Sequence, residues 1–192
     1  MQDFFFYFKL GWEHIISLDA LDHQLFILAL IAVYSYKNSK QVLILVTAFT
    51  VGHSLTLLLS VLDVIRFSSK YVEFLIPVTI VITALTNLFK KNYSKKAVNI
   101  NYFLALGFGL IHGMGFANTI RMMLSRDEYL GWGLFGFNVG LEFGQIFIVL
   151  IILFVTFIIF NFTKIRRPSW VLFVSAAVFS LALKMALERI PF

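Results

Sequence analysis

The sequence predicts an all-α membrane protein, a bundle of about six transmembrane helices. Of its 192 residues, 60% are hydrophobic and only 14% are charged. Such a composition leaves too little polar surface to cover a water-soluble globule. Apolar segments near the length of about 20 residues that crosses a bilayer also recur along the chain. We therefore expect a single integral membrane domain over residues 1–192, with no separate soluble part.

Residues 1–17 differ from the rest, because they combine many aromatic side chains with charged ones such as Lys9 and Glu13. The segment lacks the basic start and the small-residue cleavage site of a signal peptide. We predict that it lies in the membrane interface or re-enters the bilayer. The residues expected to anchor it there are aromatic: Phe4, Phe5, Phe6, Tyr7 and Trp12.

The rest of the chain contains the apolar segments that we expect to cross the membrane. Their approximate bounds are 18–36, 41–63, 71–90, 101–124, 131–160 and 169–188. The fifth is longer than a perpendicular crossing needs. We expect it to be tilted, or to begin with an interfacial turn near Tyr129 to Trp132.

Basic residues in alternate loops predict the orientation of the bundle. They are Lys37 and Lys40, then Lys90, Lys91, Lys95 and Lys96, and then Lys164, Arg166 and Arg167. Loops rich in Lys and Arg stay in the cytoplasm, so both termini should lie on the outer side of the membrane. Since the net charge of +6 comes mostly from loops, we expect the lipid bilayer and no nucleic acid as a partner.

All four histidines, His14, His23, His53 and His112, lie in or beside apolar segments. An ionisable side chain is costly in hydrocarbon and needs a partner. At a helical rise of 1.5 Å per residue, His53 and His112 lie roughly 18 and 16 Å from the inner ends of their segments. Glu142 lies about 16 Å from the outer end of its own segment. These compatible depths predict a buried metal site between the midplane and the outer leaflet.

The fifth segment carries two distinct faces at helical spacing. Asn138, Glu142 and Gln145 form a polar stripe that should face the bundle interior. On another face, three glycines recur every fourth residue: Gly136, Gly140 and Gly144. Small residues at this spacing let a neighbouring backbone approach closely.

If His14 and His23 share a site, the chain must break between them. In one helix, nine residues at 100° each would place the two side chains on opposite faces. Ser17 and Asp19 are candidate N-caps, with Asp22 at position N3 when Asp19 caps. This capping role is the alternative to metal binding for the two acids. We expect the membrane helix to begin at about residue 18 to 20, and the preceding segment to fold back and deliver His14.

Five blocks of the chain resemble the signature blocks of the HupE/UreJ family of bacterial membrane proteins. They are GWEH at 11–14, DHxLF at 22–26, FTxxHSLT at 49–56, FGLIHGxGFA at 108–117 and FNxGxExGQ at 137–145. The resemblance implies a metal permease of the inner membrane, for nickel or a related ion, linked to the maturation of metalloenzymes. One block departs from the family pattern: Thr86 stands where the family often has Glu before Asn87.

Carried over residue by residue, the resemblance implies the metal ligands His14, Asp22, His23, His53, His112 and Glu142. Side chains expected to hold these ligands in orientation are Asp19, Thr50, Ser54, Asn138 and Gln145. Imidazole and carboxylate without sulfur suit divalent Ni, Zn, Co, Fe or Mn. Such a set fills one octahedral ion or serves two ions. We favour two, because one ion bound by every ligand would have no open position.

These features fit more than one function. In a permease, the ion would arrive from the outer side, bind the cluster and pass inward along the polar stripes. In an intramembrane metalloenzyme, a mononuclear or dinuclear centre would activate water or oxygen. A metal sensor or accessory protein is a third reading. A chelate with every ligand engaged would hold its ion, which favours the enzyme, but no HExxH or GxSxG catalytic signature occurs. We therefore predict transport.

Overall fold

The protein is described by a computed structural model over residues 2–89, 95–124 and 130–191, within which some side chains are left undescribed. Every regular element in these ranges is helical, which confirms the all-α prediction. The α-helices are α1 (Gln2–Ile16), α2 (Leu21–Ile31), α3 (Ser39–Val61), α4 (Ser69–Phe89), α5 (Lys95–Leu124), α6 (Leu130–Phe162) and α7 (Arg167–Glu188). Short 3-10 turns lie at Leu18–Ala20 (η1) and Tyr36–Asn38 (η2).

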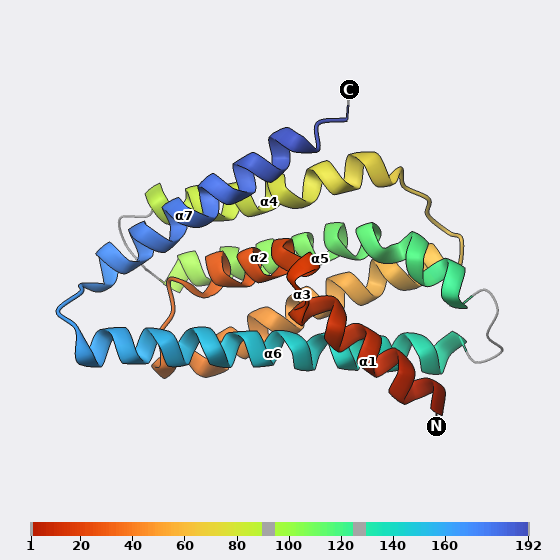
Figure 1. Cartoon of the computed structure of the whole chain (residues 1–192), viewed down its shortest axis with the longest axis horizontal. Coiled ribbons are helices and arrows are strands. Elements are labelled where there is room, and N and C mark those ends of the chain that lie inside the picture. The colour runs from red at the N-terminus through yellow and green to blue at the C-terminus, as the bar shows by residue number, and fades with distance from the viewer. Residues whose placement is uncertain (1, 90–94, 125–129, 192) are drawn as a thin grey trace.

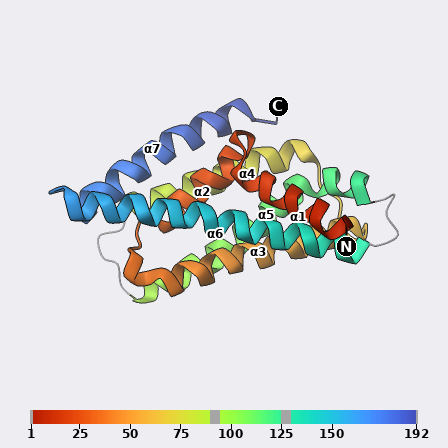
Figure 2. The same cartoon turned by 60° about the horizontal axis from the view of Figure 1, so that its bottom comes forward.

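The helices run back and forth along one long axis (Figure 1). α4 and α7 form one layer, α2 and α5 lie in the middle, and α3, α6 and α1 lie on the opposite side. Turned by 60°, the bundle shows α7 and α3 on opposite faces (Figure 2). The links 32–38 and 163–166 lie at one end of the bundle, while the link 62–68 and both chain termini lie toward the other (Figure 1).

Among the described residues, four helices are long and apolar enough to cross a membrane: α3, α4, α7 and the part of α6 from Gly131 onward. α1 and α2 together form a fifth candidate, bent by 58° at their junction. The chain is therefore a multi-pass membrane bundle with a bent N-terminal pair. The six spans remain a prediction, and so does the orientation. The predicted turn near Tyr129 and the side chains of the basic cluster 90–96 lie outside the described residues.

The predicted break between His14 and His23 is present. α1 ends at Ile16, and Ser17 adopts an extended conformation with φ −67° and ψ 154°. The Ser17 hydroxyl accepts a hydrogen bond from the Asp19 amide at 3.2 Å. The 3-10 turn then intervenes, so α2 starts at Leu21, slightly later than predicted. Ala20 precedes α2 without a side-chain cap, so Asp19 does not play the predicted capping role.

Gln24 closes this break from the side of α2. Its Nε2 donates to the carbonyl oxygens of Ile15 at 3.1 Å and Ser17 at 2.8 Å. The last carbonyls of a helix have no partner within the helix, and leaving them unpaired in a bundle is costly. Gln24 thus fixes the angle between the two helices, a role that the sequence did not suggest.

α1 packs along α6 through the glycine face predicted for the fifth segment. A Cβ atom added at Gly140 would lie only 2.0 Å from the Phe8 carbonyl oxygen, and one at Gly11 would lie 2.0 Å from the Phe137 carbonyl oxygen. The two backbones are therefore in direct contact, as small residues at this spacing permit. This contact fixes the position of α1, and with it that of His14.

The aromatic residues of α1 contribute to the same contact. Phe4 and Trp12 lie against Phe135 and Phe147 of α6, with ring centroids 6.0 and 5.3 Å apart. Tyr7 is only 3% exposed. Of the residues expected to anchor the segment in the membrane interface, these three pack on other helices, whereas Phe5 and Phe6 are exposed.

A second glycine contact joins α3 to α5. A Cβ atom at Gly109 would lie 2.1 Å from the Phe49 carbonyl oxygen, and one at Gly113 would lie 2.4 Å from the His53 carbonyl oxygen. The Thr56 hydroxyl also donates to the Leu110 carbonyl across this contact, at 2.9 Å. The close approach brings His53 and the segment around His112 onto facing helices.

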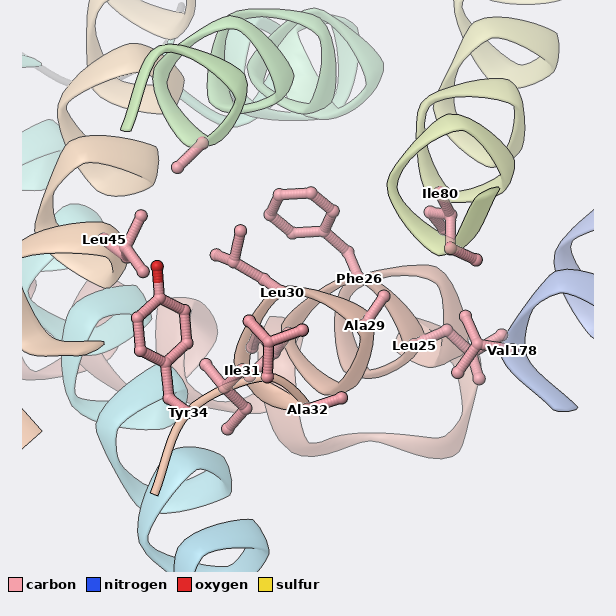
Figure 3. Close-up of a cluster of buried hydrophobic side chains, with 14 of the residues drawn as sticks. Leu25, Phe26, Ala29, Leu30, Ile31, Ala32, Tyr34, Leu45, Ile80 and Val178 are labelled. Carbon is pink, nitrogen blue, oxygen red and sulfur yellow. The ribbon is translucent and has the colours of Figure 1, made fainter. Parts of the chain in front are cut away.

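α2 lies at the centre of the main hydrophobic core (Figure 3). Its Phe26 and Ala29 are almost fully buried, and they are surrounded by Leu45 of α3, Ile80 of α4 and Val178 of α7. The Asn87 side chain of α4 donates to the Ala29 carbonyl at 2.7 Å. α2 is thereby held from several sides, so the side chains of its first turn have a defined position inside the bundle.

Candidate metal centre

Three histidines from three different helices converge beside the break. They are His14 near the end of α1, His23 in the first turn of α2 and His53 in α3. Each offers one ring nitrogen, and these nitrogens lie within 4.8 Å of one another. Nitrogens bound to one tetrahedral ion at 2.0–2.1 Å would be about 3.3 Å apart, so a small rotation of the rings suffices. We call this group the histidine triad.

His112 lies next to the triad without being part of it. Its ring centroid is 4.7 Å from that of His23, at an interplanar angle of 85°. On its other sides it contacts Phe26 and Phe49, with centroids 5.6 and 5.3 Å away. The structure therefore places all of the predicted histidines in one neighbourhood, with His112 at its edge.

The ring nitrogens in this neighbourhood lack the partners that buried polar atoms normally have. Nε2 of His14, Nε2 of His23 and both ring nitrogens of His53 are buried and accept or donate no hydrogen bond among the described residues. The same is true of His112. Burying such atoms unpaired is unfavourable, and a metal ion would satisfy them. The donor set thus fits a transition-metal ion.

Asp22 lies behind His23 rather than inside the triad. Its Oδ1 is 2.9 Å from His23 Nδ1 and accepts the His23 backbone N–H at 2.8 Å. Its Oδ2 lies 3.7 Å from Nη1 of Arg189. With the proton on Nδ1, the lone pair of His23 is on Nε2, the nitrogen free to bind metal. Asp22 therefore orients the His23 ring, as carboxylates beside metal-binding histidines commonly do.

Glu142, also predicted as a ligand, lies in a separate polar cluster between α3 and α6. Its Oε1 accepts the Thr47 hydroxyl at 2.7 Å, and its Oε2 accepts the Thr50 hydroxyl. The Thr50 hydroxyl also lies 2.8 Å from Oε1 of Gln145. Among the described residues, Glu142 is not in the group of nitrogens and oxygens close enough to share an ion with the triad.

The other residues expected to orient ligands are dispersed. Ser54 donates to the Thr50 carbonyl of its own helix at 2.7 Å. Asn138 donates to the Leu134 carbonyl at 2.9 Å, and its side chain lies beside His53 with a buried, unpaired Oδ1. Asp19 is exposed and lines a cavity next to the triad. Of Ser54, Asn138 and Asp19, only Asn138 lies beside a triad histidine.

A cavity of about 200 Å³ leads to the histidines. His14, His23 and His112 line it, together with Phe116. Its remaining lining includes four charged residues: Asp19, Asp22, Glu73 and Arg189. Three carboxylates against one guanidinium give the cavity a negative potential, and such a potential raises the local concentration of cations.

Sequence reasoning did not identify Glu73, Arg189 or Thr47. Thr47 could have been found, because it lies one helical turn before Thr50 and so on the same face of α3. Glu73 and Arg189 lie near the ends of α4 and α7, where charged residues are common, and only the tertiary packing brings them to the cavity. No local signal distinguishes them.

The family description "HupE / UreJ protein" matches residues 1–189 of the chain. No curated protein and no solved structure matches the chain. The family match extends over both the bent N-terminal pair and the helices that carry His53 and His112. The chain belongs to the HupE/UreJ family of membrane proteins.

Proposed function

We propose that this protein is a permease for a divalent transition-metal ion, nickel or a close relative, that binds at the histidine triad. The observation that carries the proposal is the convergence of three buried imidazole nitrogens within 4.8 Å. Two of the three histidines, His14 and His23, line a cavity in which three carboxylates face one guanidinium. Nitrogen ligands without thiolate suit Ni, Co and Zn in their divalent states.

The small number of ligands supports transport. Three protein ligands leave positions open for water, so an ion can gain and lose ligands one at a time. The sequence had suggested a set that would hold its ion firmly, which was the main argument for an enzyme. With Asp22 behind His23 and Glu142 in another cluster, that argument weakens. We accordingly propose one ion at the triad rather than two.

The direction of access follows from the helix ends around the cavity. Glu73 lies near the start of α4 and Arg189 just after α7, and both helix ends are at the end of the bundle opposite the links 32–38 and 163–166. Those links carry basic residues, which favour the cytoplasmic side. We therefore propose that the cavity opens to the outer face of a bacterial inner membrane, with both termini on that face. Proteins that mature metalloenzymes would receive the ion inside.

A second candidate is an intramembrane metalloenzyme. The cavity reaches the triad, so water or a small molecule could occupy an open position on the ion and be activated there. A sensor or accessory protein would use the same site without turnover. Transport and these alternatives differ in whether ions cross the membrane.

The test is uptake of Ni²⁺, Co²⁺ and Zn²⁺ into liposomes that contain the purified protein. We expect uptake above protein-free liposomes, and we expect His53→Ala to lower it by about ten-fold or more at limiting metal. Ser175→Ala, which removes a buried polar group of α7 outside the cavity lining, serves as the control and should transport normally. Equal uptake by His53→Ala would contradict the proposal. One tightly held ion with no uptake would favour the enzyme.

A further inference from the structure

The cluster around Glu142 is a second polar site in the bundle. It consists of Glu142 and Gln145 on α6 and of Thr47 and Thr50 on α3. Gln145 is 1% exposed and Thr50 is 9% exposed. Thr50 lies about 4.5 Å along the helix axis from His53, or nearly one turn. The cluster is therefore close to the triad but built from different side chains.

With the Gln145 amide oriented so that Oε1 faces Thr50, the atoms that meet in this cluster are all oxygens. The two carboxylate oxygens of Glu142 each lie at hydrogen-bond distance from a threonine hydroxyl, and Oε1 of Gln145 lies 2.8 Å from the Thr50 hydroxyl. This donor set contrasts with the nitrogen set of the triad. Hard cations prefer carboxylate, hydroxyl and carbonyl oxygens, whereas nickel and its neighbours prefer imidazole.

The charge of the cluster indicates which hard cation fits. None of the ion pairs found among the described residues includes Glu142. Glu142 is partly buried and Thr47 is exposed on the surface of the bundle. A carboxylate at this depth in a membrane bundle is costly without a counter-charge, and neutral hydroxyls compensate only in part. One carboxylate among neutral oxygens balances a single positive charge. A monovalent cation therefore matches the cluster better than a divalent one.

We propose that Glu142, Gln145, Thr47 and Thr50 form a sodium site that is separate from the histidine triad. Carboxylate, hydroxyl and carbonyl oxygens are the ligands that a hard cation such as Na⁺ prefers, and the cluster presents them from the side chains of two facing helices. Binding of Na⁺ does not depend on the proposed transport function. Its use as the ion whose movement is coupled to metal transport does rest on that function.

The binding experiment uses the purified full-length protein without added metal. The midpoint of thermal unfolding is measured in rising NaCl, with choline chloride holding the ionic strength constant and KCl as the comparison salt. Because a ligand of the folded state stabilises it, we expect Na⁺ to raise the midpoint saturably by about 3 °C, and K⁺ to raise it less. Glu142→Gln and Thr50→Val should lose this response.

Matched variants separate this site from its surroundings. Thr156→Val removes a hydroxyl of the same helix α6 and should keep the Na⁺ response. Among the described residues, this hydroxyl donates to the Ile152 carbonyl of its own helix, at 2.7 Å. His53→Ala should also keep it while losing nickel binding. If Glu142→Gln does not fold, Thr47→Val and Thr50→Val carry the test.

Three outcomes would overturn the sodium site. One is a wild-type midpoint that responds equally to Na⁺, K⁺ and choline. Another is a full Na⁺ response in Glu142→Gln or Thr50→Val. The third is a loss of the response in His53→Ala, which would make the cluster part of the triad. Failure of metal uptake with an intact Na⁺ response would instead reject only the permease.

Discussion

Asp22 is the residue that connects the triad to the rest of the bundle. Its Oδ1 accepts hydrogen bonds from the ring Nδ1 and the backbone N–H of His23. Its Oδ2 faces the guanidinium of Arg189, near the other end of the sequence. Its charge is shared between His23 and a guanidinium at the cavity lining. The carboxylate therefore both orients the His23 ring and offsets the positive charge of Arg189, which would repel a cation in the proposed transport.

We predict that Asp22→Asn weakens nickel binding about ten-fold, because Asn accepts the bond from His23 without supplying negative charge. Equilibrium dialysis of the purified protein at constant pH measures the change. Asp63→Asn is the control, since Asp63 is an exposed acid in the link after α3 that bonds Arg66. Unchanged affinity in Asp22→Asn would mean that its charge does not act on the ion.

At this scale the sequence predicted part of the site. Apolar surroundings and the family resemblance pointed to His14, His23 and His53, which the structure brings together. The depth of Glu142 was also compatible, yet its side chain lies among threonines. Depth fixes a position along the membrane normal but not the direction in which a side chain points. That direction depends on how helices are rotated against one another, which a single sequence does not reveal.

The α1–α6 contact acts at the scale of elements, since it determines where His14 lies. Gly11 and Gly140 allow the two backbones to touch, and His14 follows Gly11 by less than one turn. The sequence predicted that the glycine face of the fifth segment would receive another backbone. It also predicted the break near Ser17. It did not indicate that the partner would be the N-terminal segment, because helix pairing is a tertiary property.

We predict that Gly140→Leu displaces α1 and lowers both stability and nickel affinity. A Cβ atom at this position would lie 2.0 Å from a backbone oxygen of Phe8, so the helices must separate. Overpacking of this kind costs about 1–3 kcal/mol. Thermal unfolding and nickel binding measure the two effects. Gly131→Leu on the same helix faces open space and should behave as wild type. A wild-type nickel affinity in Gly140→Leu would show that the α1–α6 contact does not position His14.

At the scale of the whole molecule, composition and segment lengths were enough to predict a helical membrane bundle. The alternation of basic links agrees with the arrangement of the helices, since the links 32–38 and 163–166 lie at the same end (Figure 1). The pairing of α4 with α7, and the place of α2 between them and α3, could not be predicted. Apolar helices have similar surfaces, and their choice of neighbours depends on side-chain shape.

We predict that an ion at the triad stabilises the whole bundle. Metal that binds only the folded protein should raise the midpoint of thermal unfolding, on the order of 5 °C at a hundred-fold excess over the dissociation constant. The increase should shrink as the pH falls, because protons compete for imidazole nitrogens. A scan with nickel and with chelator measures it. The His14→Ala/His23→Ala/His53→Ala variant should show no response, and an equal response there would place the ion elsewhere.

The packing of α1 on α6 also determines when, during synthesis and membrane insertion, the triad can assemble. α1, α2 and α3 leave the ribosome first and carry every histidine of the triad, yet α1 has its packing surface on a helix made much later. Until α6 has been inserted, His14 lacks the support that holds it beside His23 and His53. Of the three triad imidazoles, a newly made chain therefore has only His23 and His53 in place, and His14 joins them when membrane insertion is nearly complete.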